Sequence, residues 1–216
     1  MMSTAIYSIP FLLNGLAITI TMSLLVVVLS LLLGGALGMV VTYGPRPVKW
    51  TVRLFSDIVR GIPILVLIFF VFYGLPAIGI NLPNFAAATA ALVVYKTAQT
   101  VEYVRGAVQS IHDGQTEAAK SIGLTFEQRM AYVVLPQAIR RFLPPWINGV
   151  ADAVKGTALV SLLGVTDLMH AIQQVVGRTY DPIPLYVLGA AIYFMINYGL
   201  SSLSRYVEGR YAYIRD

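Results

Sequence analysis

Three charged side chains lie inside segments that are otherwise apolar, and they are the residues of this sequence best placed to do chemistry. Lys96 interrupts the stretch FAAATAALVVYKTAQTVEYV, and Asp152 and Lys155 lie three positions apart in a second apolar stretch. A charge at the centre of a bilayer costs roughly 2.5 to 3.5 kcal/mol, so such a residue usually faces the protein interior or an aqueous path. These positions are candidates for contact with a polar solute.

Asp152 and Lys155 share one face of a helix, because residues three apart are neighbours on a helix surface. Two interpretations follow. In the first, the two charges neutralise each other inside a helix bundle. In the second, Lys155 lines a path together with Thr157 and Ser161 and meets a carboxylate of the substrate, with Asp152 beside it.

Lys96 also allows two interpretations. If the side chain points into a path, it favours an anionic or carboxylate-rich substrate. If it points to a neighbouring subunit, it forms a structural pair there. Glu102 is six residues further on and so lies off the helical face of Lys96.

The composition places these charges in a membrane protein. Only 12% of the 216 residues are charged, against about 25% in soluble proteins, and the mean hydropathy is +0.75. The net charge of +5 is then no sign of nucleic-acid binding, because basic residues in membrane proteins gather in loops. His112 and His170 are isolated, so we expect no metal site. The sequence contains no glycine-rich phosphate loop and no serine-nucleophile motif.

The elements that must position the charges are membrane-spanning helices, each of which needs about 20 apolar residues. The charge-poor stretches predict five spans in a single domain over residues 1–216, so the fold class is an all-α membrane protein. The fourth span is expected to begin at the pair Pro144–Pro145, because proline suits a first helical turn. The expected spans are residues 11–42, 60–78, 85–110, 145–165 and 184–207.

The basic residues predict the orientation of these spans, since loops rich in Lys and Arg stay in the cytoplasm. Twelve of the fifteen Lys and Arg residues fall in, or at the span ends that adjoin, the loop between spans one and two, the loop between spans three and four, and the segment after span five. The N-terminus is therefore expected outside and the C-terminus, including Arg215, in the cytoplasm. The opposite loops carry only Arg178, and residues 167–184 there are expected to include an external helix.

The longest polar segment, residues 113–136, is predicted to be a cytoplasmic helical hairpin. Asp113 can cap a first helix, and Gly123 is placed to end it. Thr125 and Gln128 form a capping-box pattern that starts a second helix, and Pro136 is expected to end its regular hydrogen bonding. The second helix has one apolar face, made by Phe126, Met130, Val133 and Val134. Such a hairpin could simply cover the membrane domain, whereas a DNA-reading role does not fit its place between two spans.

The spacing within this hairpin resembles the EAA loop of permease subunits of bacterial ABC importers. That pattern is Glu-Ala-Ala, three residues, Gly, nine residues, then Ile-x-Leu-Pro. Here it corresponds to Glu117, Ala118, Ala119, Gly123, Leu135 and Pro136, with Val133 in place of the isoleucine. The segments RGIPILV (60–66) and KGTALVSLLGV (155–165) are similar to parts of the polar amino-acid uptake permeases, which include the histidine and lysine/arginine/ornithine systems.

The resemblance implies a type I ABC importer permease in a bacterial inner membrane, in contact with lipid. A cytoplasmic ATPase dimer would grip the six EAA residues, an extracytoplasmic binding protein would deliver the substrate, and an identical or sister permease would complete the path. ATP and Mg²⁺ would bind the ATPase, so this chain would be no enzyme and would carry no cofactor. Nucleic acid is not an expected partner.

The resemblance also favours the path interpretation of Lys155, Thr157 and Ser161, because the family commonly has a lysine and hydroxyl residues in this segment. Gly156 departs from that pattern, since a polar or acidic residue is common there. A preference for basic amino acids is therefore not indicated. The alternative function is an ion-coupled secondary transporter, which would also carry charges at mid-membrane but normally shows repeated halves.

Overall fold

The computed structural model describes residues 2–211, and helices make up most of this range. Arg215 of the expected cytoplasmic C-terminus lies outside the described residues. The α-helices are α1 (Met2–Tyr43), α2 (Arg46–Gly61), α3 (Ile64–Ala77), α4 (Asn84–Gln109), α5 (Asp113–Ser121), α6 (Phe126–Arg129), α7 (Leu135–Thr157), α8 (Leu168–Thr179) and α9 (Pro182–Tyr211). A π-helical turn, Met130–Val134, joins α6 to α7, and a 3₁₀ segment, Ala158–Leu163, follows α7.

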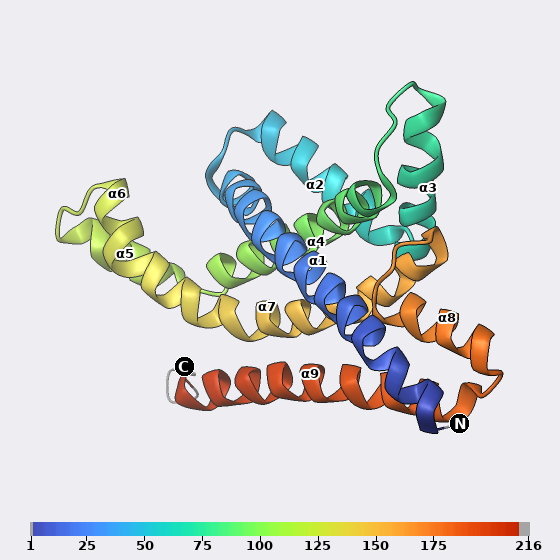
Figure 1. Cartoon of the computed structure of the whole chain (residues 1–216). Coiled ribbons are helices and arrows are strands. Elements are labelled where there is room, and N and C mark those ends of the chain that lie inside the picture. The colour runs from blue at the N-terminus through green and yellow to red at the C-terminus, as the bar shows by residue number, and fades with distance from the viewer. Residues whose placement is uncertain (1, 212–216) are drawn as a thin grey trace.

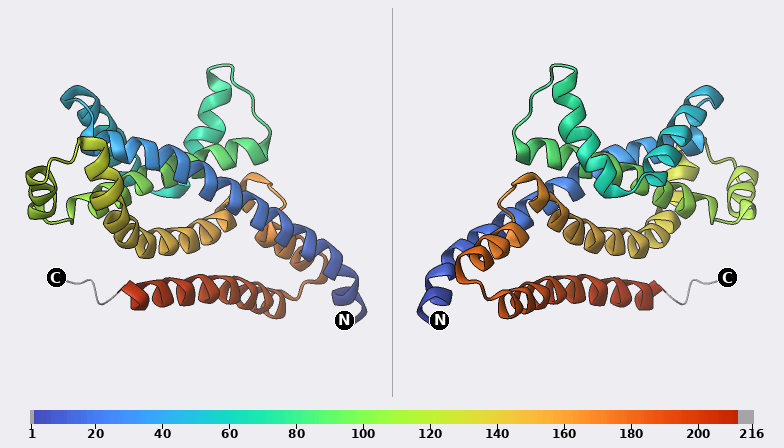
Figure 2. Two further views of the ribbon diagram at one scale, coloured as in Figure 1. Left: turned by 90° about the vertical axis from the view of Figure 1, so that its left-hand side faces the viewer. Right: turned by 90° about the vertical axis from the view of Figure 1, so that its right-hand side faces the viewer.

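Helix α1 runs diagonally across α4, while α9 runs alongside α7 (Figure 1). The short helices α5 and α6 project at one end of the molecule. The C-terminal end of α9 lies at the same end, and the N-terminal end of α1 lies at the other (Figure 2). The chain thus has one end built from the hairpin and another built from α8 and the start of α1.

Among the described residues, helix length and hydropathy identify two helices able to cross a membrane, Ile9–Tyr43 and Pro182–Arg210. The number rises to four if each of two bent pairs is counted as one span: α2 with α3, bent by 105°, and Phe126–Leu163 with α8, bent by 47°. The predicted count of five stays a prediction. Helix α4 is not one of these helices, because polar side chains in its middle lower its mean hydropathy. These side chains, which include Lys96, Thr97 and Thr100, are buried against other helices of the chain.

The bend between α2 and α3 has a local cause. Ile62 precedes Pro63, and the residue before a proline is disfavoured in the helical region. Its backbone is extended, with φ −87° and ψ 132°. Residues 60 and 61, which we expected in the second span, therefore belong to α2.

The helix of the fourth predicted span does not begin at Pro144–Pro145, and the membrane boundary of that span stays a prediction. Helix α7 already begins at Leu135 and passes through both prolines. The Ser204 hydroxyl of α9 donates to the Pro144 carbonyl at 3.2 Å, so α9 contacts α7 at the prolines. Pro136 lies in the first turn of α7, directly after the π-helical turn, so the regular α-helical hydrogen bonding is interrupted before it although the chain continues as a helix.

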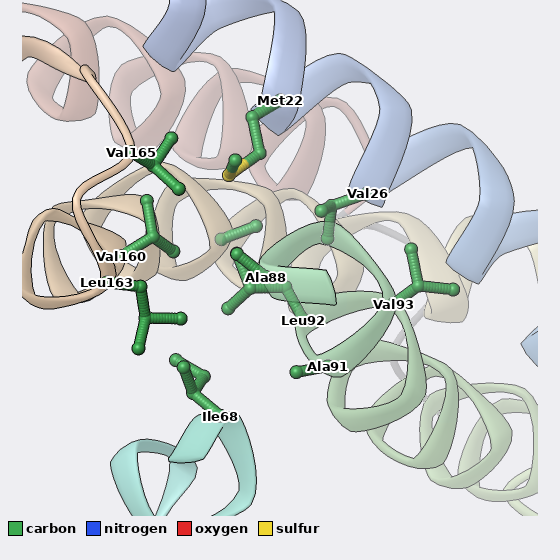
Figure 3. Packing of buried hydrophobic residues seen from close by; sticks show 11 residues of the cluster. Met22, Val26, Ile68, Ala88, Ala91, Leu92, Val93, Val160, Leu163 and Val165 are labelled. Atoms are coloured by element: carbon green, nitrogen blue, oxygen red, sulfur yellow. The ribbon is translucent and has the colours of Figure 1, made fainter. Parts of the chain in front are cut away.

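The largest apolar core forms where α1, α3, α4, α7 and the 3₁₀ segment meet (Figure 3). Met22 and Ile68 are fully buried there, and Leu92 of α4 lies between them and the 3₁₀ segment. The alanines of α4 that line this core, Ala88 and Ala91, allow the helices to approach closely. The core fixes α7 relative to α1 and α4, and so positions the charges on α7.

The crossing of α1 and α4 depends on two glycines four residues apart. A Cβ atom at Gly34 would lie 2.5 Å from the Thr100 Cβ and 2.9 Å from the Thr97 carbonyl oxygen, and one at Gly38 would lie 2.6 Å from the Val104 Cβ. Glycines at this spacing are a common device for close helix packing in membranes. The neighbouring Gly35 has no heavy atom within 4 Å of its Cβ position.

We expect Gly34→Val to destabilise the fold, because the added side chain would force α1 away from α4. Overpacking costs about 1 to 3 kcal/mol, which corresponds to a melting temperature lower by about 3 to 10 °C in a chain of this size. Thermal unfolding of the detergent-solubilised chain measures this, with Gly35→Val as the matched control. Equal melting temperatures for the two variants would contradict the close packing at Gly34.

Candidate functional site

The turn between α5 and α6 is held by the hydrogen bonds that the sequence indicates. Gly123 has φ +82°, the left-handed region that glycine adopts without strain. Its N–H donates to the Lys120 carbonyl at 2.9 Å, and the Leu124 N–H donates to the Ala119 carbonyl at 3.1 Å. These two bonds form a Schellman motif. The prediction that Gly123 ends the first helix is confirmed.

The capping box at the start of α6 is also confirmed. The Gln128 N–H donates to Thr125 Oγ1 at 3.3 Å, and the Thr125 N–H donates to Gln128 Oε1 at 2.9 Å. The cap of α5 differs from the prediction, since His112 rather than Asp113 holds that position. His112 Nδ1 accepts from the Gly114 N–H at 3.1 Å, and Asp113 lies in the first turn.

The hairpin attaches to the membrane helices through a small apolar cluster. Val108 and Ile111, at and just beyond the end of α4, pack there against Val134 and Ala138. The Arg141 guanidinium also donates to the Ser110 carbonyl. Both contacts join the base of the hairpin to the end of α4, so a displacement of the hairpin would be carried into α4 and α7.

The outer surface of the hairpin is exposed and partly apolar. Glu117, Ala118, Gly123 and Pro136 are exposed, Leu135 is half-buried and Ala119 is buried. Large apolar side chains also face outward here: Ile122 is 76% exposed, Tyr132 73% and Phe126 50%. Of the predicted apolar face, Val134 and Met130 pack against the end of α4, whereas Phe126 lies at the surface. Exposed apolar groups rimmed by polar ones are typical of a protein contact.

Asp152 and Lys155 form the ion pair that their spacing predicts, with Lys155 Nζ 2.7 Å from Asp152 Oδ1. The pair does not lie inside the bundle of this chain, because the two side chains are 55% and 58% exposed. Asn148, one turn earlier on α7, is exposed on the same face. Helix α7 therefore presents a polar stripe on an open face of the chain.

Lys96 of α4 is only 5% exposed and lies beside a small pocket lined by residues of α1, α4 and α7. Its ammonium group donates to Gln99 Oε1 at 2.8 Å. Among the residues that the structure describes, no carboxylate forms a salt bridge with it. Lys96 is therefore a buried cation without a paired anion, although the charges of Asp152 and Lys155 both act on it.

Thr157 and Ser161 are buried rather than exposed on the polar stripe. Each hydroxyl donates to a carbonyl three residues earlier, Thr157 to Val154 at 2.7 Å and Ser161 to Ala158 at 2.8 Å. Within this chain, the structure therefore brings Asp152 and Lys155 together on the exposed face. It does not bring Thr157 and Ser161 to that face.

Sequence reasoning missed an ionic network that joins α2 to α4. Glu102 Oε2 lies 2.6 Å from the Arg105 guanidinium and 3.5 Å from that of Arg60. The i,i+3 spacing of Glu102 and Arg105 could have indicated the first contact. The contact of Arg60 with Glu102 spans the bend at Pro63 and leaves no local signal in the sequence. Asp167 was also missed, and it caps α8 by accepting from the His170 N–H at 2.9 Å.

Comparison with known proteins identifies the family. The family model for the binding-protein-dependent transport system inner membrane component matches residues 30–213. The chain belongs to this family. This permease is 35% identical over 204 residues to the probable glutamine ABC transporter permease protein GlnP of Bacillus subtilis, with 93% of each chain covered. It is 31% identical to the glutamine transport system permease protein GlnP of Escherichia coli over 205 residues, with 94% of each covered.

The permease is also similar to solved structures. A chain of an amino acid ABC transporter crystallised with histidines shares 32% sequence identity and a TM-score of 0.90, with 97% of both chains covered. A chain of the MetNI methionine ABC transporter in an inward-facing conformation has a TM-score of 0.73 at 20% identity, over 91% of this chain and 96% of that one, and so shows the fold alone. The permease is thus an all-α inner-membrane component of an ABC importer with the type I permease-like fold.

Proposed function

We propose that this permease forms one half of the membrane path of an ATP-driven importer for a polar amino acid or a related compound. The observation that carries the proposal is its likeness, over 97% of the chain, to a subunit of an amino acid ABC transporter. The exposed polar stripe at Asp152 and Lys155 supports it, because a charged pair on a membrane helix requires either water or a protein partner. A second permease, identical or a sister, would cover this face.

The proposal assigns the partners to the two ends of the molecule. The exposed hairpin would dock into a cytoplasmic ATPase dimer, with Glu117, Ala118 and Gly123 at the contact and Leu135 and Pro136 at the base. Helix α8 would face an extracytoplasmic binding protein. The basic loops support an N-terminus outside and a C-terminus in the cytoplasm of a bacterial cell. ATP and Mg²⁺ would bind the ATPase, and this chain would hold no cofactor.

Uptake into proteoliposomes tests the proposal. The permease is copurified from its native membrane with its ATPase and combined with its binding protein, and the uptake of labelled glutamine, histidine, arginine and glutamate is measured. We expect uptake of at least one of them to require internal ATP and to persist when ionophores dissipate the sodium and proton gradients. Uptake that needs an ion gradient and no ATP would instead support the secondary transporter.

Lys96 is proposed to favour anionic substrates through its unpaired charge. At an effective dielectric constant near 20, a charge about 8 to 16 Å away contributes about 1 to 2 kcal/mol. We therefore expect Lys96→Gln to lower the uptake of glutamate relative to glutamine by about tenfold. The three other substrates, measured in the same vesicles, are the control. An unchanged substrate profile would assign Lys96 a structural role instead.

A further inference from the structure

The cytoplasmic end of α1 touches the hairpin through a pair of aromatic rings. The rings of Tyr43, the last residue of α1, and Phe126, the first residue of α6, are 5.4 Å apart at their centroids and meet edge to face at 74°. This is a favourable geometry for two aromatic rings. The contact joins segments that are distant in the sequence.

The contact bridges an open space. A cavity of about 490 Å³ lies between the ends of α1 and α4 and the helix α5. Polar side chains line much of it, among them Thr42, Gln109, Glu117 and Lys120. The hairpin is therefore not packed continuously against the membrane helices. It is held at its base, by the cluster around Val134, and at Phe126, by Tyr43.

Both partners of the ring pair are fixed in place. On the α1 side, the Lys49 ammonium group of α2 donates to the Thr42 carbonyl at 2.5 Å, and this bond ties the end of α1 to α2. On the hairpin side, Arg129 donates to the Leu124 carbonyl at 3.0 Å and places its guanidinium 6.0 Å from the Phe126 centroid. Both segments that carry the rings are held by hydrogen bonds, so the pair can transmit a displacement.

We infer that the Tyr43–Phe126 pair is a second mechanical link between the hairpin and the membrane helices, and that Tyr43 is a positioning residue for coupling. The base of the hairpin moves α4 and α7, whereas the ring pair moves α1, whose other contacts reach α4, α7 and α8. A displacement of the hairpin then reaches α1 directly, in addition to α4 and α7. The inference rests on the proposed function, in which the hairpin receives the displacement from an ATPase.

The test is the amount of substrate transported per ATP hydrolysed by the complete reconstituted complex, measured with whichever of the four labelled amino acids is taken up. The loss of an edge-to-face pair lowers an equilibrium by roughly two- to tenfold, so we expect Tyr43→Ala to lower this ratio by roughly threefold or more. The ATPase should still copurify and hydrolyse ATP. Tyr43→Phe keeps the ring and should behave as the unmodified protein.

Three comparisons make the test specific. Tyr206→Ala, which removes an exposed tyrosine on α9, should leave the ratio unchanged. The double variant Tyr43→Ala/Phe126→Ala should be no worse than Phe126→Ala alone, because each change breaks the same contact. A normal ratio for Tyr43→Ala, or effects that add in the double variant, would overturn the inference. Normal transport by Gly123→Val would contradict the proposed coupling role of the hairpin itself. Impaired transport by Gly123→Val together with a normal ratio for Tyr43→Ala would overturn only the inference about the ring pair.

Discussion

Gly123→Val is expected to lower ATP-driven uptake by roughly tenfold while the permease still inserts and accumulates. A residue with a side chain pays about 1 to 2 kcal/mol in the left-handed conformation, which changes an equilibrium by roughly 5- to 30-fold. No heavy atom lies within 4 Å of the Cβ position of Gly123, so the effect arises from the backbone and not from a clash. The valine would shift the turn out of its Schellman motif and tilt α5 relative to α6.

The chain offers a matched control for this strain. Gly79 has φ +85°, also has no heavy atom near its Cβ position, and lies in the turn between α3 and α4, far from the hairpin (Figure 1). Gly79→Val should therefore carry the same backbone cost and leave coupling intact. Gly123→Asn should be intermediate, because asparagine tolerates this conformation better than valine. Equal uptake by Gly123→Val and Gly79→Val would show that the shape of the hairpin does not matter for coupling.

The hairpin could be predicted from the sequence because its signals are local. A Schellman turn at Gly123 and a capping box at Thr125 and Gln128 depend on residues within five positions of one another, and both appear as expected. The cap of α5 was placed one residue late, because His112 and Asp113 can both accept from a nearby N–H, and no pattern in the sequence ranks them.

The helices within the membrane were harder to predict, because their neighbours override local signals. Pro144 and Pro145 usually mark a helix start, yet α7 passes through them in contact with α9. The sequence around Lys96 does not indicate whether its side chain is buried or exposed. Its burial follows from the packing of α4 against α1 and α7. The spacing of Asp152 and Lys155 predicted their pairing but not the open face on which they lie.

Lys155→Gln is expected to lower uptake by about tenfold or more without a comparable loss of stability. An exposed ion pair contributes about 0 to 1 kcal/mol, and more than half of each side chain of the Asp152–Lys155 pair is exposed in this chain. Its loss should therefore lower the melting temperature only slightly. A lysine that meets a substrate carboxylate through a charge-assisted hydrogen bond contributes about 1.5 to 3 kcal/mol, which corresponds to roughly 10- to 150-fold in affinity.

The charge-swapped variant Asp152→Lys/Lys155→Asp separates the two interpretations of the pair. It retains an ion pair at the same spacing on α7 but moves the ammonium group by three residues, nearly one helical turn. We expect the swapped protein to melt like the unmodified one and to transport as poorly as Lys155→Gln, since in the path interpretation the displaced lysine would no longer meet the substrate. Recovery of uptake in the swapped protein would mean that the pair acts only through its mutual neutralisation.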